Sequence, residues 1–231
     1  MLIDIRDLYK IYNEGKESEV RALDGVTLQI DKGGFVAIVG QSGSGKSTMM
    51  NVLGCLDIPT YGEYYLDGTD ISSLNDKQLA RIRNREIGFI FQGYNLIQEL
   101  DALENVTLPL IYRGVSVFDR EDMAMEALAR VGMEDRAHHR PAEMSGGQQQ
   151  RVAIARAIAT SPPIIMADEP TGALDSRTGR HVIEILQGLY RGGTTILLIT
   201  HDDNIAATAK RVVRLSDGKV ISDSPQEVDW E

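Results

Sequence analysis

The feature that most constrains the fold of this chain is a glycine-rich turn between a short apolar run and a helical stretch. Residues 40–48 read Gly-Gln-Ser-Gly-Ser-Gly-Lys-Ser-Thr, which matches the pattern G-x-x-x-x-G-K-[ST]. Glycines allow a backbone to fold around an anion with its N–H groups pointing inward, and a helix N-terminus adds a partial positive charge. The sequence therefore predicts a phosphate-binding loop, with a buried strand at residues 35–39 before it and a helix from Lys46 after it.

Three side chains of this loop have separate expected roles. We expect Lys46 to reach the β- and γ-phosphates of a nucleotide, the Ser47 hydroxyl to ligate Mg²⁺, and Thr48 to lie beside the α-phosphate. The candidate nucleotide-binding residues of the loop are Gly40, Gln41, Ser42, Gly43, Ser44, Gly45, Lys46, Ser47 and Thr48.

A second motif supplies two acidic groups. The apolar run 164–167 is followed by Asp168, Glu169 and Pro170. We expect Asp168, at the carboxyl end of this strand, to hold Mg²⁺ through water, and Glu169 to polarise the water that attacks the γ-phosphate. Together the two motifs predict binding and hydrolysis of a nucleoside triphosphate.

The hydrophobic pattern predicts an α/β fold with a mainly parallel sheet. Continuous apolar runs are typical of strands covered on both faces, whereas the alternation within residues 1–30 is typical of half-buried antiparallel strands. Buried strands that alternate with helices indicate a parallel sheet. The expected buried strands are 35–39, 87–91, 164–167 and 195–199, and the expected helices are 46–56, 76–85, 120–131, 145–160 and 176–190.

We expect residues 1–231 to form one domain with an insertion. Residues 1–92 and 145–223 are expected to make the α/β core with its antiparallel β subdomain, and residues 93–144 a helical subdomain. A hairpin turn is expected at 216–219, because Asp-Gly readily adopts turn conformations, and a surface tail at 224–231.

Composition excludes several classes of function. The 231 residues include 24 Lys and Arg against 34 Asp and Glu, so the net charge of −10 argues against nucleic-acid binding and against a polybasic membrane anchor. Cys55 is the single cysteine, which excludes a disulfide framework within the chain. No apolar run approaches the ~20 residues of a membrane span, and the N-terminus does not read as a secretory signal. These features predict a soluble, cytoplasmic protein.

A third motif, at residues 144–151, resembles the signature of ABC-type ATPases. It reads Met-Ser-Gly-Gly-Gln-Gln-Gln-Arg. Ser145 can cap the helix that begins there, and two glycines leave backbone N–H groups exposed at its positive end. The resemblance implies that two cassettes pair head to tail and hold ATP between the loop of one and the signature of the other. The signature residues that serve the opposite chain's ATP are then Ser145, Gly146, Gly147 and Gln148.

The same resemblance implies roles for residues elsewhere in the chain. Gln92 is similar to the glutamine that contacts Mg²⁺ and the attacking water, and His201 to the histidine that contacts the γ-phosphate. Asp175 is similar to the aspartate of the D-loop, which follows the second motif. Tyr12 is similar to the aromatic residue that stacks on adenine, with Tyr9 as the alternative.

Three phrases, at residues 51–57, 103–110 and 171–176, are similar to the macrolide-exporter and lipoprotein-releasing group of these cassettes. Two positions depart from the pattern: Met144 replaces the usual leucine, and Gly34 stands where glutamate is common.

The resemblance implies an ATP-hydrolysing subunit that powers a separate membrane subunit, through ATP-driven dimerisation, in a transporter or mechanotransmitter. A regulatory cassette that signals to cell-wall hydrolases is the alternative, and a soluble ABC ATPase of DNA repair or translation is a further one.

The expected partners are a second copy of the chain and a membrane permease, which places the protein on the inner face of the cell membrane. We expect the permease to dock on the helical subdomain near Tyr94, Leu96 and Ile97, which directly follow Gln92. The alternative is that these apolar residues belong to the core.

Overall fold

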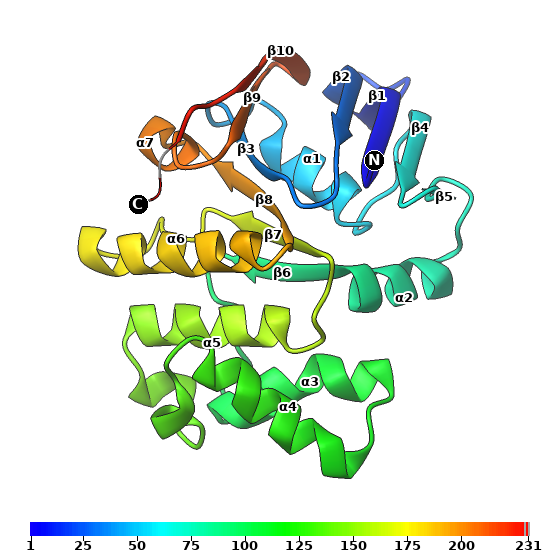
Figure 1. Cartoon of the computed structure of the whole chain (residues 1–231). Coiled ribbons are helices and arrows are strands. Elements are labelled where there is room, and N and C mark those ends of the chain that lie inside the picture. The colour runs from blue at the N-terminus through cyan, green and yellow to red at the C-terminus, as the bar shows by residue number, and fades with distance from the viewer. Residues whose placement is uncertain (229, 231) are drawn as a thin grey trace. The chain divides into compact units, whose positions relative to one another are not determined.

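The structure, a computed structural model, describes residues 1–228 and 230. It contains two compact units: unit 1 comprises residues 1–83 and 195–231, and unit 2 comprises residues 84–194. Figure 1 shows the elements of both units along the chain. Among the described residues, no helix is long and apolar enough to cross a membrane.

An antiparallel sheet makes up the first part of unit 1. Its strands are β1 (Ile3–Tyr12), β2 (Val20–Ile30), β4 (Tyr61–Leu66) and β5 (Thr69–Asp70), in the order β2-β1-β4-β5. Apolar side chains such as Ile3, Ile5 and Leu28 are buried while their neighbours along the strand are more exposed. This confirms the half-buried antiparallel strands predicted within residues 1–30.

A second group of strands in unit 1 carries the phosphate-binding loop. β3 (Phe35–Val39) lies between β8 (Thr195–Thr200) and β9 (Arg211–Ser216) and is parallel to both, while β10 (Lys219–Pro225) pairs with β9 in an antiparallel hairpin. Every residue of β3 and β8 is buried, as their continuous apolar runs predict. The expected hairpin turn is confirmed, with left-handed conformations at Asp217 and Gly218.

The helices of unit 1 are short. α1 (Lys46–Leu53) follows β3 through the glycine-rich loop, and α7 (Asp203–Ala206) follows β8. α2 (Asp76–Glu86) starts in unit 1 and is predominantly polar, with Leu79 as its buried residue.

Unit 2 contains two parallel strands and four longer helices. β6 (Ile87–Phe91) pairs with β7 (Ile164–Asp168). α5 (Gly146–Ile158) lies between α6 (Ser176–Arg191) on one side and α3 (Ala102–Arg113) with α4 (Val117–Ala129) on the other (Figure 1). Two single-turn 3-10 helices, Glu134–Arg136 and Pro141–Glu143, connect α4 to α5.

Three helices differ from the sequence prediction, of which α1 ends at Leu53 rather than at residue 56, with Gly54 as its C-cap. α3 was not among the expected helices; it begins at a capping box, in which the Asp101 side chain accepts from the Glu104 N–H and Glu104 accepts from the Asp101 N–H. Pro109, which normally argues against a helix interior, lies within it, and its carbonyl accepts a hydrogen bond from Asn84. α4 begins at Val117 rather than Arg120, because the Ser116 hydroxyl caps it.

The stretch expected as a helical subdomain, residues 93–144, holds α3, α4 and the two 3-10 helices. The tail expected at 224–231 includes residues 229 and 231, which lie outside the described residues. In its described part, β10 continues to Pro225, and Trp230 donates its indole N–H to the Thr208 carbonyl, 3.1 Å away. The Trp230 ring also lies 5.6 Å from that of Phe35.

Candidate functional site

The loop between β3 and α1 has the close backbone approaches that require glycine. A Cβ on Gly40 would lie 2.3 Å from the Leu215 carbonyl oxygen, and one on Gly45 would lie 2.4 Å from that of Ala22. Gly45 also has a φ of 102°, a left-handed conformation that other residues adopt at a cost. The turn from β3 into α1 therefore depends on glycine at both ends of the loop.

The loop is suited to an anion. No side chain caps the N-terminus of α1, and its first turn carries no acidic residue, so its backbone N–H groups face the loop without a competing carboxylate. The Ser44 hydroxyl is buried and has no hydrogen-bond partner among the described residues. The Lys46 ammonium lies over the loop and donates to the carbonyl oxygens of Gly40 (2.7 Å) and Gln41 (2.8 Å). These unpaired donors and the fixed positive charge are what phosphate groups need.

Tyr12, at the end of β1, lies beside the first turn of α1, where the Thr48 hydroxyl interacts with its phenol. Partial burial raises the pKa of the Tyr12 phenol, while the Thr48 hydroxyl of α1 acts in the opposite direction. The pKa of Tyr9 is raised instead by its hydrogen bond to Asp7 on the same strand. The Tyr12 ring is 37% exposed, and the Lys10 ammonium lies 5.1 Å from its centre. An accessible ring beside α1 favours Tyr12 over Tyr9 for a stacking role.

His201 lies at the same sheet edge as the loop. Val39 and Thr200 are paired across β3 and β8, so Gly40 and His201 each follow a paired residue at the carboxyl ends of two neighbouring parallel strands. His201 is exposed there, and Asp202 after it caps α7. Unit 1 thus brings together the loop, Tyr12 and His201.

Unit 2 brings together the predicted glutamine and acidic residues in the same way. Phe91 pairs with Asp168 across β6 and β7, so Gln92 and Glu169 are the next residues at one sheet edge. The Gln92 amide nitrogen lies 2.7 Å from where a Cβ on Gly172 would stand. Glu169 has a φ of 46°, and the turn after it closes with a hydrogen bond of 3.0 Å from the Gly172 N–H to the Glu169 carbonyl.

Carboxylate oxygens suit Mg²⁺, which takes one or two protein oxygens and completes its shell with phosphate and water. Within unit 2, Asp168 is half-buried at the end of β7 and pairs with Phe91, the residue before Gln92. Within unit 1, the Ser47 hydroxyl lies in the first turn of α1. Among the described residues there is no group of three or more His, Cys, Asp or Glu side chains that could hold a metal.

The signature helix α5 begins with the predicted cap. The Gln148 N–H donates to the Ser145 hydroxyl at 3.3 Å, and the Ser145 N–H donates to the Gln148 side chain at 2.8 Å. A Cβ on Gly146 would lie 2.6 Å from the Tyr94 hydroxyl, and one on Gly147 would lie 2.3 Å from a Thr178 methyl. A side chain at either position would require Tyr94 or Thr178 to shift, so the two glycines allow close packing as well as exposing the helix end.

Asp175 caps α6. Its carboxylate accepts from the N–H groups of Arg177 and Thr178 and from the Thr178 hydroxyl, at 3.0, 3.1 and 2.6 Å. These hydrogen bonds, the Thr178 hydroxyl first, lower the pKa of Asp175. The D-loop carboxylate thus also fixes the start of a helix.

The segment after Gln92 is held by a contact that the sequence does not indicate. Arg156 of α5 donates to the carbonyl oxygens of Tyr94 (2.8 Å) and Asn95 (2.5 Å), both of which have left-handed conformations. Burial lowers the pKa of the Arg156 guanidinium. Leu96 is only 7% exposed, so the core alternative is the right one for this residue. Ile97 is exposed and Tyr94 half-buried, as a contact surface requires.

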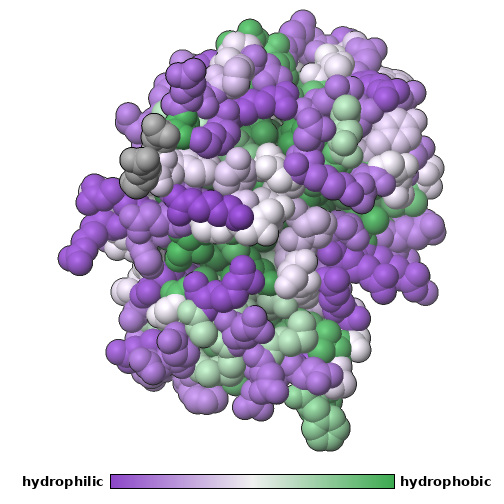
Figure 2. Space-filling model, viewed as in Figure 1, coloured by the Kyte–Doolittle hydropathy of each residue, from purple (hydrophilic) through white to green (hydrophobic). Residues whose placement is uncertain are grey.

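Exposed apolar side chains also gather at the turn between α3 and α4, which the sequence analysis did not single out. Figure 2 shows hydrophobic surface over this part of unit 2. The residues concerned are Ile111, Tyr112, Val117 and Phe118.

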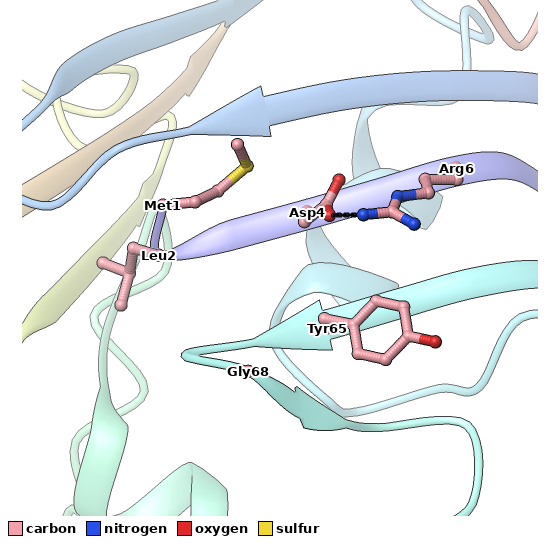
Figure 3. A pocket seen from close by; sticks show the side chains of 6 residues that line it. All are labelled: Met1, Leu2, Asp4, Arg6, Tyr65 and Gly68. Carbon is pink, nitrogen blue, oxygen red and sulfur yellow. Dashed lines mark hydrogen bonds and ion pairs between the residues drawn. The ribbon is translucent and has the colours of Figure 1, made fainter.

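A hollow on the antiparallel sheet of unit 1 does not belong to these groups (Figure 3). It is lined by Met1, Leu2, Asp4, Arg6, Tyr65 and Gly68. Its two charged side chains form an ion pair of 2.5 Å, and the hydrogen bond from Arg6 lowers the pKa of Asp4. The charges of these two side chains therefore neutralise each other.

A buried strand, a glycine-rich loop that can hold phosphate (here residues 40–48, the cradle) and a helix in an α/β fold define the class of P-loop nucleotide-binding proteins. The family model described as "ABC transporter" matches residues 23–172. The chain belongs to the ABC transporter family.

Individual relatives agree with this assignment. The macrolide export ATP-binding/permease protein MacB of Hyphomonas neptunium is 52% identical over 223 residues, which is 96% of this chain and 34% of the relative. The chain thus spans about a third of the length of such relatives. An uncharacterized ABC transporter ATP-binding protein of Thermotoga maritima is 48% identical, covering 95% of this chain and 93% of the relative.

A solved structure shows the same fold. The ATP-binding cassette MJ0796, a dimer in a post-hydrolysis state bound to ADP and Pi, has a TM-score of 0.90 and 46% identity, covering 99% of this chain and all of that one.

Proposed function

We propose that this chain is the ATP-binding and ATP-hydrolysing cassette of an ABC transporter or mechanotransmitter. The observation that carries the proposal is the cradle between β3 and α1, where an uncapped helix end whose first turn has no acidic residue, a buried hydroxyl and the Lys46 ammonium gather. The reaction is the hydrolysis of ATP to ADP and phosphate.

In this proposal the residues of unit 1 bind the nucleotide. The N–H groups from Gly40 to Thr48 surround the phosphates, and Lys46 places its charge on the β- and γ-phosphates. The Tyr12 ring stacks on adenine, and His201 donates to the γ-phosphate. Ser47, Gln92 and Asp168 would hold Mg²⁺, which when bound neutralises the phosphate charge.

Glu169 is the proposed general base. Its position one residue beyond Asp168 lets its carboxylate orient a water and accept its proton, while Gln92 orients the same water through its amide. Ser145, Gly146, Gly147 and Gln148 are proposed to bind the γ-phosphate of a second copy's ATP, and Asp175 to lie at the interface between copies. A dimeric cassette of the same fold supports this arrangement.

The proposed role of Lys46 in nucleotide binding can be tested directly. Lys46→Ala should weaken MgATP binding by about 10²-fold, because hydrogen bonds from a charged donor to phosphate are among the strongest in proteins. Isothermal titration calorimetry measures the change. Lys32→Ala is the matched control, since the Lys32 ammonium lies 2.8 Å from Asp67 on the same unit. Equal nucleotide affinity in the Lys46 and Lys32 variants would place the site elsewhere.

We further propose that the pairing and separation of the two cassettes move a membrane permease, which the chain contacts on the inner face of the cell membrane. Relatives named as ATP-binding/permease proteins support a permease partner. The docking surface is placed at Tyr94 and Ile97 and at the exposed apolar residues of the α3–α4 turn. The permease, rather than this chain, selects the transported substrate.

Ile97→Asp should reduce the amount of membrane subunit that co-purifies with the chain by about tenfold, because a charge in an apolar contact is left without a partner. Affinity purification from solubilised membranes measures this. Ile221→Asp, at a comparably exposed isoleucine of β10, should have no effect. Equal recovery with both variants would remove Ile97 from the docking surface.

A further inference from the structure

A buried glutamine in the signature helix contacts the turn that carries the proposed base. Gln150 is fully buried in α5, and its side-chain nitrogen donates to the Pro170 carbonyl at 2.9 Å. Pro170 directly follows Glu169. The two segments are 20 residues apart in sequence and belong to the same unit.

The orientation of the Gln150 amide is set by its partner. The Pro170 carbonyl can only accept a hydrogen bond, so the NH₂ group must face it. The amide oxygen is then directed elsewhere, and it is buried without a hydrogen-bond partner among the described residues. The hydrogen bond to Pro170 contributes to stability, whereas the unpaired amide oxygen, a buried polar atom, lowers it and so offsets part of that contribution. Stability alone therefore does not explain glutamine at this position.

The turn that Gln150 contacts needs an external restraint. Glu169 has a φ of 46°, an unusual conformation for a residue with a side chain, and such residues persist where the surroundings hold them. The backbone hydrogen bond from Gly172 closes the turn on one side. The Gln150 amide holds the Pro170 carbonyl from the side of α5.

We infer that Gln150 is a positioning residue that fixes the direction of the Glu169 carboxylate from the signature helix. Gly146 and Gln150 are four residues apart and so lie on one face of α5. The N-terminus of α5 is proposed to bind the second copy's ATP. Through the rigid helix α5 it is thereby connected to Glu169, the proposed general base of the same chain. This inference rests on the proposed roles of Glu169 and the signature.

Gln150→Met tests the inference, because methionine is unbranched, of similar length and has no N–H donor. We expect kcat for ATP hydrolysis to fall about tenfold, since a small misplacement of a reacting group has a large effect on rate. The KM for ATP and MgATP binding should stay within about twofold, because neither uses Glu169 in this proposal. The melting temperature should fall by about 2–4 °C, because the Pro170 carbonyl loses its donor while removal of the unpaired oxygen offsets part of that loss.

Val152→Ala is the matched control for a purely structural effect. Val152 is equally buried in α5 but points to another face, and its truncation should lower the melting temperature without lowering kcat at a temperature well below melting. If Gln150→Met melts below the assay temperature, Gln150→Asn decides instead, because it keeps the amide but is one methylene too short to reach Pro170; its kcat should also fall.

The outcomes separate this inference from the proposed function when Glu169→Gln is assayed in parallel. A Gln150 variant that turns over within twofold of the parent, beside an inactive Glu169→Gln, overturns the positioning role alone. A Val152→Ala protein whose kcat falls as far as that of Gln150→Met overturns it as well. A fully active Glu169→Gln overturns the proposed function.

Discussion

Glu169→Gln should lower the rate of ATP hydrolysis by about 10²–10⁴-fold while MgATP still binds. Glutamine keeps the size and the hydrogen-bonding reach of glutamate but cannot accept the proton of the attacking water. Binding persists because it depends on the cradle of unit 1 and on Asp168. The substitution also removes one negative charge beside the triphosphate, so affinity for ATP should not fall.

The same variant should accumulate as a dimer when MgATP is added. ATP joins two cassettes in the proposed mechanism, and a pair that cannot hydrolyse it does not separate. Size-exclusion chromatography with and without MgATP measures the shift in mass. Glu184→Gln, an exposed carboxylate of α6 paired with His181, is the control and should behave as the parent. A Glu169→Gln protein that stays monomeric at saturating MgATP contradicts both the base assignment and the sandwich mechanism.

The fold could be predicted where a local pattern carries the information. Continuous apolar runs identify β3, β7 and β8, because a strand covered on both faces needs apolar residues at every position. α3 was not among the expected helices although Asp101 and Glu104 form a capping box, and it contains Pro109, a residue that normally disfavours a helix interior. The sequence alone does not show that the apolar face of this helix, which includes Val106 and Leu110, is fully buried by tertiary packing.

The same distinction between local sequence patterns and tertiary contacts applies to the candidate site. The glycine-rich loop and the acidic pair are local motifs, and the structure places each at the carboxyl end of a buried strand, where the pattern puts them. The contacts of Arg156 with Tyr94 and of Gln150 with Pro170 join distant segments. In one sequence, a polar residue inside a helix is indistinguishable from a solvated one. Only the fold reveals that Gln150 is buried and that Arg156 is half-buried.

Ser145→Arg should abolish ATP-driven dimerisation and leave MgATP binding by the single chain unchanged. Ser145 is exposed at the N-terminus of α5, in unit 2, whereas the cradle is in unit 1. In the proposed dimer this serine meets the γ-phosphate of the opposite copy. An arginine side chain fills the space that the phosphate needs and removes the hydroxyl that binds it.

The measurement is sharpest in the Glu169→Gln background, where the dimer should otherwise be stable. The double variant should elute as a monomer with MgATP, and calorimetry should still detect nucleotide binding.

Loss of the cap by itself costs about 1 kcal/mol, so a control must remove a cap without touching the signature. Ser116→Arg does so, because the Ser116 hydroxyl caps α4 through the Asp119 N–H at 3.3 Å, the same distance as in α5. Since both variants lose an equivalent cap and gain the same charge, only the place of the serine distinguishes them. Dimers that persist with Ser145→Arg show that the signature does not serve the opposite chain.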